Sequence, residues 1–188
     1  MAETLEEIFA ETERHMRKSV EVFSHDLATI RTGRASPALV EHIPVEVYGT
    51  SMPLNQLANI TVPEPRLIVI QPWDRSTLGA IDRAIRKSEL NLNPTNDGTV
   101  VRIAIPPLTE ERRRELVKIV RRRAEEARVA VRNNRRDAHE QMKRLEKEKL
   151  ISADELKRAE ERLQKLTNRF IEEIDELTEL KEREILEV

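Results

Sequence analysis

Glycine and proline are confined to the middle of this chain of 188 residues. All four glycines and all nine prolines lie between Gly33 and Pro107, and the stretches 1–32 and 108–188 contain neither residue. Because both residues interrupt regular helices, the two ends of the chain are free to be helical and the middle is not. The sequence therefore predicts a helical part built from both ends, with a different kind of domain inserted between them.

The two ends carry three amphipathic patterns, in which apolar residues recur every three or four positions. The first pattern begins near Thr4. The second follows Thr109 and should end at about Leu150, and the third begins at Ser152. The third has its apolar residues at Leu156, Leu163, Leu166, Phe170, Ile174, Leu177 and Ile185. Each helix would be unstable alone in water, whereas three apolar stripes can bury one another, so we expect a long three-helix bundle.

Short runs rich in Val and Ile predict β-strands in the middle of the chain. These runs are residues 45–48, 60–62, 66–71 and 99–105. Residues 76–88 predict a helix that Asp74 caps. The predicted fold class is therefore α+β: an elongated three-helix bundle, residues 1–30 and 108–188, with an inserted small mixed α/β domain, residues 31–107.

Two segments connect the predicted bundle to the inserted domain. They are Thr32 with Gly33 and Pro106 with Pro107, and two crossings at one place would form a two-strand hinge. The motif TGRASP, residues 32–37, is equally consistent with a simple linker.

A block of positive charge lies in the second helical pattern. Residues 112–136 hold eleven Lys and Arg against three Glu, a local charge of +8 in a chain whose net charge is −2. On a helical wheel the apolar residues lie within about 40° of Val120, and the basic side chains lie about 60–160° from it. The apolar residues are Leu116, Ala124, Ala127, Val131, Ala138, Met142 and Leu145. The basic residues are Arg114, Lys118, Arg121, Arg128, Arg132, Arg135 and Arg136. Glu125 interrupts the basic series.

Like charges on one helix face repel, so folding alone gives no reason to gather these side chains. An ordinary solvated face is the alternative, but seven basic positions on one face favour a polyanion partner, and acidic flanks would oppose nonspecific binding. Aromatic residues make up only 3% of the chain, so we expect contacts to a phosphate backbone rather than to bases.

The sequence offers no catalytic, cofactor or metal site. It has no cysteine and no phosphate-binding glycine loop. His139-Glu140 begins like a zinc-protease motif, but the second histidine is missing. We expect Tyr48 and Trp73 to be core residues rather than contacts. The chain is thus expected to be non-enzymatic, without cofactor or metal.

No apolar run approaches the roughly 20 residues that span a bilayer, and the acidic N-terminal stretch lacks the features of a signal peptide. We expect a cytoplasmic protein without a membrane partner. Three complementary stripes in one chain favour a monomer. A helical scaffold that pairs through these stripes is the alternative, and it would self-associate.

Six motifs, taken in order along the chain, resemble those of the bacterial ribosome recycling factor family. They are TGRASP (32–37), PLNQLANI (53–60), QPWDRS (71–76), LNPTNDG (92–98), PPLTEERRREL (106–116) and VRNNRRDA (131–138). The resemblance covers essentially the whole chain. It implies a translation factor that binds the post-termination ribosome and, with elongation factor G and GTP, promotes subunit splitting and release from the messenger. The GTP would belong to that partner.

The resemblance also implies roles for particular residues. It places the bundle against the ribosomal RNA of the large subunit, and the inserted domain against elongation factor G. The family's key arginine matches Arg132, and Arg128, Arg135 and Arg136 share its motif. Arg31 precedes the matching TGRASP and would extend the basic surface.

Asn134 departs from the family pattern, which usually has Ile or Val there. The helical wheel puts it at the edge of the buried face, where an unpaired buried amide would cost about 1–3 kcal/mol. We expect that Asn134 either finds a partner or loosens the bundle locally.

Overall fold

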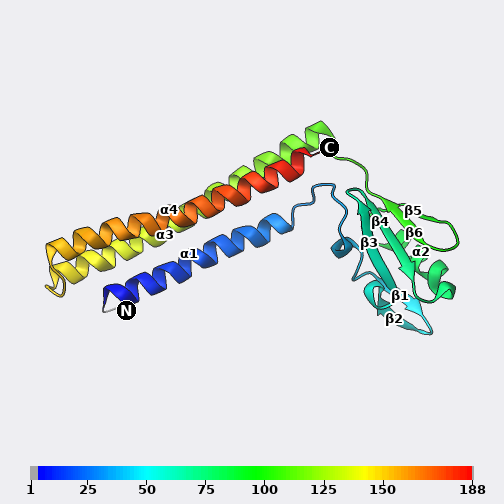
Figure 1. The fold of residues 1–188 in the computed structure, drawn as a ribbon, viewed down its shortest axis with the longest axis horizontal. Helices are drawn as coiled ribbons and strands as arrows, with labels where there is room; N and C mark the ends of the chain where they lie inside the picture. The colour runs from blue at the N-terminus through cyan, green and yellow to red at the C-terminus, as the bar shows by residue number, and fades with distance from the viewer. Residues whose placement is uncertain (1–3, 188) are drawn as a thin grey trace. The chain divides into compact units, whose positions relative to one another are not determined.

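The structure is a computed structural model, and it describes residues 4–187. The chain divides into two compact units. One contains the chain up to Arg31 together with Glu110–Glu187, and the other contains Thr32–Thr109. Three long helices make up the first unit, and two small antiparallel sheets with a short helix make up the second (Figure 1). The predicted fold class, a three-helix bundle with an inserted α/β domain, is confirmed.

The helices of the bundle begin at capping residues. Helix α1 (Leu5–Ala28) starts after Thr4, whose hydroxyl accepts a hydrogen bond from the Glu7 amide at 3.2 Å. Helix α4 (Ala153–Leu186) starts with a complete capping box between Ser152 and Glu155. These caps satisfy amide groups that the first helical turn leaves free.

Helix α3 (Glu110–Lys147) ends three residues before the predicted Leu150. Lys149 adopts a left-handed φ of 60°. The Lys149 and Leu150 amides donate to Glu146 and Leu145 at 2.9 Å each, which is the Schellman pattern of a helix end. Glycine is the usual residue at this position, so the sequence carries no visible stop signal here.

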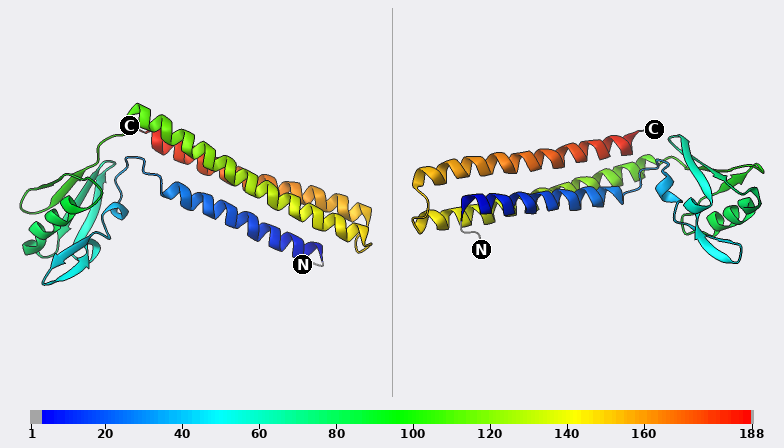
Figure 2. Two further views of the ribbon diagram at one scale, coloured as in Figure 1. Left: turned by 180° about the vertical axis from the view of Figure 1, so that it is seen from behind. Right: turned by 60° about the horizontal axis from the view of Figure 1, so that its bottom comes forward.

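Helices α1 and α4 run parallel in a fixed register. Three ion pairs between them join residues that are each 156 positions apart. These pairs are Glu6–Arg162, Glu13–Arg169 and Arg17–Glu173. Their guanidinium groups also lie over the rings of Phe9 and Phe170, at 3.9–4.8 Å from the ring centres. Helix α3 packs against both, as the two views of Figure 2 show.

The predicted apolar stripe of α3 is buried at every position, from Leu116 to Leu145. The stripe of α4 differs from the prediction, because Leu156, Leu166 and Leu177 are only partly buried. Ala159, Thr167 and Thr178 are buried instead. Each of these threonine hydroxyls donates to the carbonyl four residues earlier, at 2.8 and 2.7 Å. A threonine whose hydroxyl is satisfied in this way can occupy a core position.

The inserted unit contains a two-stranded and a four-stranded sheet. Strands β1 (Pro44–Val47) and β2 (Thr50–Pro53) pair antiparallel. The larger sheet has the order β3-β4-β6-β5 and is antiparallel throughout. Its strands are β3 (Ala58–Glu64), β4 (Leu67–Pro72), β5 (Pro94–Asn96) and β6 (Val101–Ala104). The sequence did not indicate β2 and β5, because their few residues are mostly polar or proline and are extended through pairing with a neighbour.

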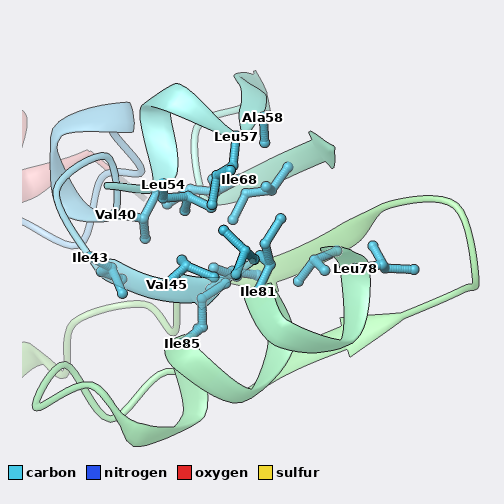
Figure 3. Packing of buried hydrophobic residues seen from close by; sticks show 14 residues of the cluster. Val40, Ile43, Val45, Leu54, Leu57, Ala58, Ile68, Leu78, Ile81 and Ile85 are labelled. Atoms are coloured by element: carbon cyan, nitrogen blue, oxygen red, sulfur yellow. The ribbon is translucent and has the colours of Figure 1, made fainter. Parts of the chain in front are cut away.

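Helix α2 (Leu78–Lys87) covers the core of this unit. Its buried side chains Leu78, Ile81 and Ile85 point toward those of the strands and loops (Figure 3). The prediction that Asp74 caps this helix was wrong in detail. Asp74 accepts from the Ser76 amide at 3.0 Å and caps the short 3-10 turn Arg75–Thr77 that precedes α2. Two further 3-10 turns lie at Pro37–Leu39 and Leu54–Gln56.

The TGRASP segment is fastened to the inserted unit rather than loose. The Ala35 amide donates to the Pro65 carbonyl at 2.7 Å, and the Ser36 hydroxyl accepts from the Ala38 amide at 3.3 Å. Gly33 has a φ of 78°, and a Cβ there would lie 3.2 Å from Leu108 Cγ. A side chain at position 33 would therefore be strained and crowded.

Asn134 is half-buried in α3, and its Nδ2 donates to Ser19 Oγ of α1 at 3.4 Å. It borders a groove of about 420 Å³ between the two helices, which Val22, Ala127 and Ala130 also line. We expected Asn134 either to find a hydrogen-bond partner or to loosen the bundle. It has found a partner, but the hydrogen bond is long.

We predict that Asn134→Ile raises the melting temperature by about 2 °C. The new methyl groups would cover apolar surface at about 0.8 kcal/mol per buried carbon, and only a long hydrogen bond would be lost. Thermal unfolding followed by circular dichroism measures the change. Ser19→Ala is the control. It should lower the melting temperature less in the Asn134→Ile background, because the hydrogen bond between residues 19 and 134 is already absent there. An unchanged or lower melting temperature would contradict the prediction.

Candidate nucleic-acid interface

The predicted basic residues of the bundle lie on the outer side of α3. Arg114, Lys118, Arg121 and Arg136 are exposed, and Arg128, Arg132 and Arg135 are partly exposed. Arg31 is also exposed and follows the end of α1. The structure thus brings the seven residues of α3 together along one helix surface.

Two of these arginines pair with acidic residues of α4. Arg121 Nε lies 2.8 Å from Glu182 Oε1, and Arg128 Nη2 lies 2.7 Å from Asp175 Oδ1. Burial disfavours the charge of Arg128, but hydrogen bonds to Asp175 and Glu125 outweigh this effect and raise the pKa of its guanidinium. The expectation that folding gives no reason to gather the arginines was therefore wrong for Arg121 and Arg128, because their counter-charges lie on another helix.

Glu125, the one gap in the basic series, lies between two arginines. Its two carboxylate oxygens are 3.2 Å from Arg128 Nη1 and 3.3 Å from Arg132 Nη1. The Arg128 side chain is 23% exposed, whereas that of Arg132 is 44% exposed. Arg132 therefore presents more of its guanidinium to solvent than Arg128, and Glu125 holds it in place.

The remaining basic side chains are free to meet a partner. Within residues 4–187, Lys118, Arg135 and Arg136 form no hydrogen bond or ion pair with another residue of the chain. Among the described residues, Arg114 pairs only with the exposed Glu110 of its own helix, at 2.7 Å. The unbalanced positive charge is thus concentrated around Arg132, Arg135 and Arg136, where phosphate oxygens would find unoccupied donors.

His139 was the histidine of the partial zinc-protease motif. His139 pairs with Glu160 at 3.5 Å, and the described part of the chain contains no group of three potential metal ligands. Among residues 4–187 there is also no helix long and apolar enough to span a membrane.

The expectation that Tyr48 and Trp73 are core residues was wrong. Their exposed fractions are 71% and 68%, although they are the only Tyr and the only Trp of the chain. Sequence reasoning also missed the counter-ions Glu125, Asp175 and Glu182. Only Glu125 gave a visible signal, since it precedes Arg128 by three residues and Arg132 by seven.

We predict that the arginines of this surface differ in their effect on stability. Arg128→Ala removes ion pairs to Asp175 and Glu125 and the packing of a partly buried stem, so it should lower the free energy of unfolding by about 1–2 kcal/mol. Arg136→Ala should change it by less than about 0.5 kcal/mol. Urea denaturation of both variants tests this difference, and equal effects would contradict the assignment of a structural role to Arg128.

Comparison with known proteins places this geometry in a family. The family model for ribosome recycling factor matches residues 23–186. A ribosome-recycling factor from Carboxydothermus hydrogenoformans is 59% identical over 184 residues, covering 98% of this chain and 100% of the relative. One from Thermus thermophilus is 56% identical and covers 97% of this chain and 99% of the relative.

Comparison with solved structures indicates the same family. A solution structure of a ribosome recycling factor superposes with a TM-score of 0.72 at 55% identity, covering 100% of both chains. A model of the Thermus thermophilus factor, described with Escherichia coli elongation factor G on the post-termination complex, gives a TM-score of 0.63 at 56% identity and covers 98% of this chain and 100% of that one. On the family match and the identity over nearly its full length, this chain belongs to the ribosome recycling factor family.

Proposed function

We propose that this chain recycles ribosomes: it binds the post-termination ribosome and, with elongation factor G and GTP, promotes splitting of the subunits and release from the messenger. The observation that carries this proposal is the group of basic side chains on α3 that no acidic residue of α4 neutralises, in a chain that matches this family over nearly its full length. Ribosomal RNA is the polyanion that such a surface would meet. The chain acts without chemistry of its own, and the GTP is the partner's.

The bundle is the part that holds the ribosome. Arg132, Arg135, Arg136 and Lys118 contact the phosphates of large-subunit RNA, and Arg31 and Arg114 extend this surface. Arg121 and Arg128 support it from the side, because their charges are already matched by α4. Arginine suits this task, since its planar group binds phosphate oxygens through two donors at once.

The inserted domain, residues 31–107, is the part that elongation factor G contacts. Thr32 and Gly33 on one connection, and Pro106 and Pro107 on the other, form the hinge. The positive φ of Gly33 allows a sharp bend of the chain at that point. When the elongation factor moves the inserted domain while the bundle stays bound, the displacement breaks contacts between the ribosomal subunits.

The protein acts as a monomer in the cytoplasm. Its three apolar stripes are already buried against one another, which leaves no stripe for a second copy. Large apolar side chains at the surface of the bundle, such as Val22, Val129 and Leu180, are scattered over different helices. This pattern is ordinary for a monomer and gives the scaffold alternative no support.

The first test mixes post-termination ribosomes with this chain, elongation factor G and GTP, and follows the light scattering of the ribosomes. The ribosomes and the elongation factor should come from the same organism as the chain. We predict a decrease in scattering that requires the chain, elongation factor G and GTP together.

Arg132→Ala should weaken ribosome binding about tenfold or more, because one charged pair to phosphate is lost. The slope of the logarithm of the binding constant against the logarithm of the salt concentration should become less negative by about 0.7–0.9.

The matched control is Arg158→Ala, which removes an exposed arginine of α4. It should leave binding and salt slope unchanged. Wild-type affinity in the Arg132→Ala variant would contradict the assignment of the RNA surface, and absence of splitting by the unmodified chain would contradict the function.

We predict the opposite effect for Glu125→Gln. Gln retains an oxygen that accepts hydrogen bonds from Arg128 and Arg132, but it removes a negative charge next to the bound phosphates. Binding to the large subunit should tighten about threefold, as expected for one charge interaction at a solvated surface. Binding titrations at two salt concentrations measure the change. Weaker binding would show that the charge of Glu125 is needed to position the arginines.

A further inference from the structure

The two largest aromatic side chains of the inserted unit lie at its surface. Tyr48 and Trp73 are 71% and 68% exposed. Burial of a large apolar side chain is favourable by about 1.5–3 kcal/mol, and the core of this unit is built instead from Val, Ile and Leu. Folding therefore does not explain why these two rings are present.

Tyr48 occupies a backbone conformation that its residue type rarely adopts. Val47 pairs with Thr50, so Tyr48 and Gly49 form a two-residue hairpin turn between β1 and β2. Their φ angles are 53° and 76°, and turns with positive φ at both positions normally carry Asn, Asp or Gly first. A bulky residue in this region is an outlier, and such strain is found mostly at functional sites.

Asp74 ties the Tyr48 turn to the segment that carries Trp73. The Tyr48 hydroxyl donates to Asp74 Oδ2, and Asp74 Oδ1 accepts from the Ser76 amide at 3.0 Å and from the Ser76 hydroxyl at 2.7 Å. The Trp73 amide donates to the Leu57 carbonyl at 3.1 Å. Both rings are thus carried on backbone that hydrogen bonds hold in place, which suits a preformed contact surface.

The charged group in contact with the Tyr48 hydroxyl is a carboxylate. Hydrogen bonds from Tyr48 and Ser76 hold the pKa of Asp74 below its ordinary value, so the carboxylate is charged at neutral pH. The neighbouring Arg75 keeps its positive charge, but its guanidinium is held at the Gly98–Thr99 turn, where it donates to the Gly98 carbonyl at 3.0 Å and to Thr99 Oγ1 at 3.4 Å. The Asp74 carboxylate would repel a phosphate placed beside it, and the exposed rings resemble the Trp and Tyr anchors of protein interfaces.

We propose that Tyr48, Trp73 and Asp74 form the docking surface of the inserted unit for a protein partner, and that this partner is elongation factor G. The inference rests on the proposed function, and it names the residues of that contact. The matching surface of the partner has an apolar depression for the rings and a Lys or Arg opposite Asp74. The basic surface of α3 and this aromatic and acidic surface therefore serve chemically different partners.

The test uses the full chain in the splitting assay, with elongation factor G titrated at fixed GTP, and separately measures binding to post-termination ribosomes without elongation factor G. Trp73→Ala should raise the concentration of elongation factor G at half-maximal splitting rate about thirtyfold, as loss of an interface anchor does. Its binding to ribosomes alone should stay unchanged. Tyr48→Phe keeps the ring and should have a smaller effect. Leu180→Ala, an exposed apolar residue of α4, is the matched control.

The outcomes separate the two levels of the proposal. Splitting by Trp73→Ala at the unmodified rate and half-saturation would overturn the docking surface while the function stands. Weaker binding of Trp73→Ala to ribosomes alone would overturn the choice of partner and assign the rings to the ribosome. Failure of the unmodified chain to split ribosomes would overturn both the function and the inference that rests on it.

Discussion

Mutual burial of three apolar stripes is the interaction on which the rest of the structure depends. None of the three helices has a second apolar face, so each is stable only when the other two are in place. The helix that closes the bundle, α1, is separated from the other two in sequence by the whole inserted unit. Ion pairs at a constant offset of 156 residues fix its register against α4. The two ends of the chain must therefore meet before any long helix is secure.

The same register organises the charge of the molecule. Acidic residues of α4 face part of the basic series on α3, so Arg121 and Arg128 are neutralised within the bundle. Further along α3, within the part of the chain that the structure describes, no acidic residue of α4 pairs with Arg132, Arg135 or Arg136. Because part of the basic series is neutralised by α4 and the rest faces solvent, positive charge can be concentrated on one surface without loosening the helices that carry it.

The two units present different chemistry to their surroundings. The bundle offers arginines on a long rigid helix, which suits a phosphate backbone. The inserted unit offers two aromatic rings and a carboxylate on hydrogen-bonded turns, which suits a protein. A factor with two chemically distinct surfaces on two units joined by a pair of short connections can bind one partner while another moves it.

Sequence alone determined the bundle, the insertion and the apolar stripe of α3, because periodicity and the placement of Gly and Pro act locally along the chain. It also located the basic face and, through its motifs, the family. Only the tertiary structure decided where α3 ends, since Lys149 takes a glycine-like conformation there. It alone paired Arg128 with Asp175, placed Thr167 in the core and Trp73 at the surface. The end of α3 depends on local hydrogen bonds that no residue type there signals. The other outcomes depend on which residues of distant segments meet, and local pattern carries no information about such contacts.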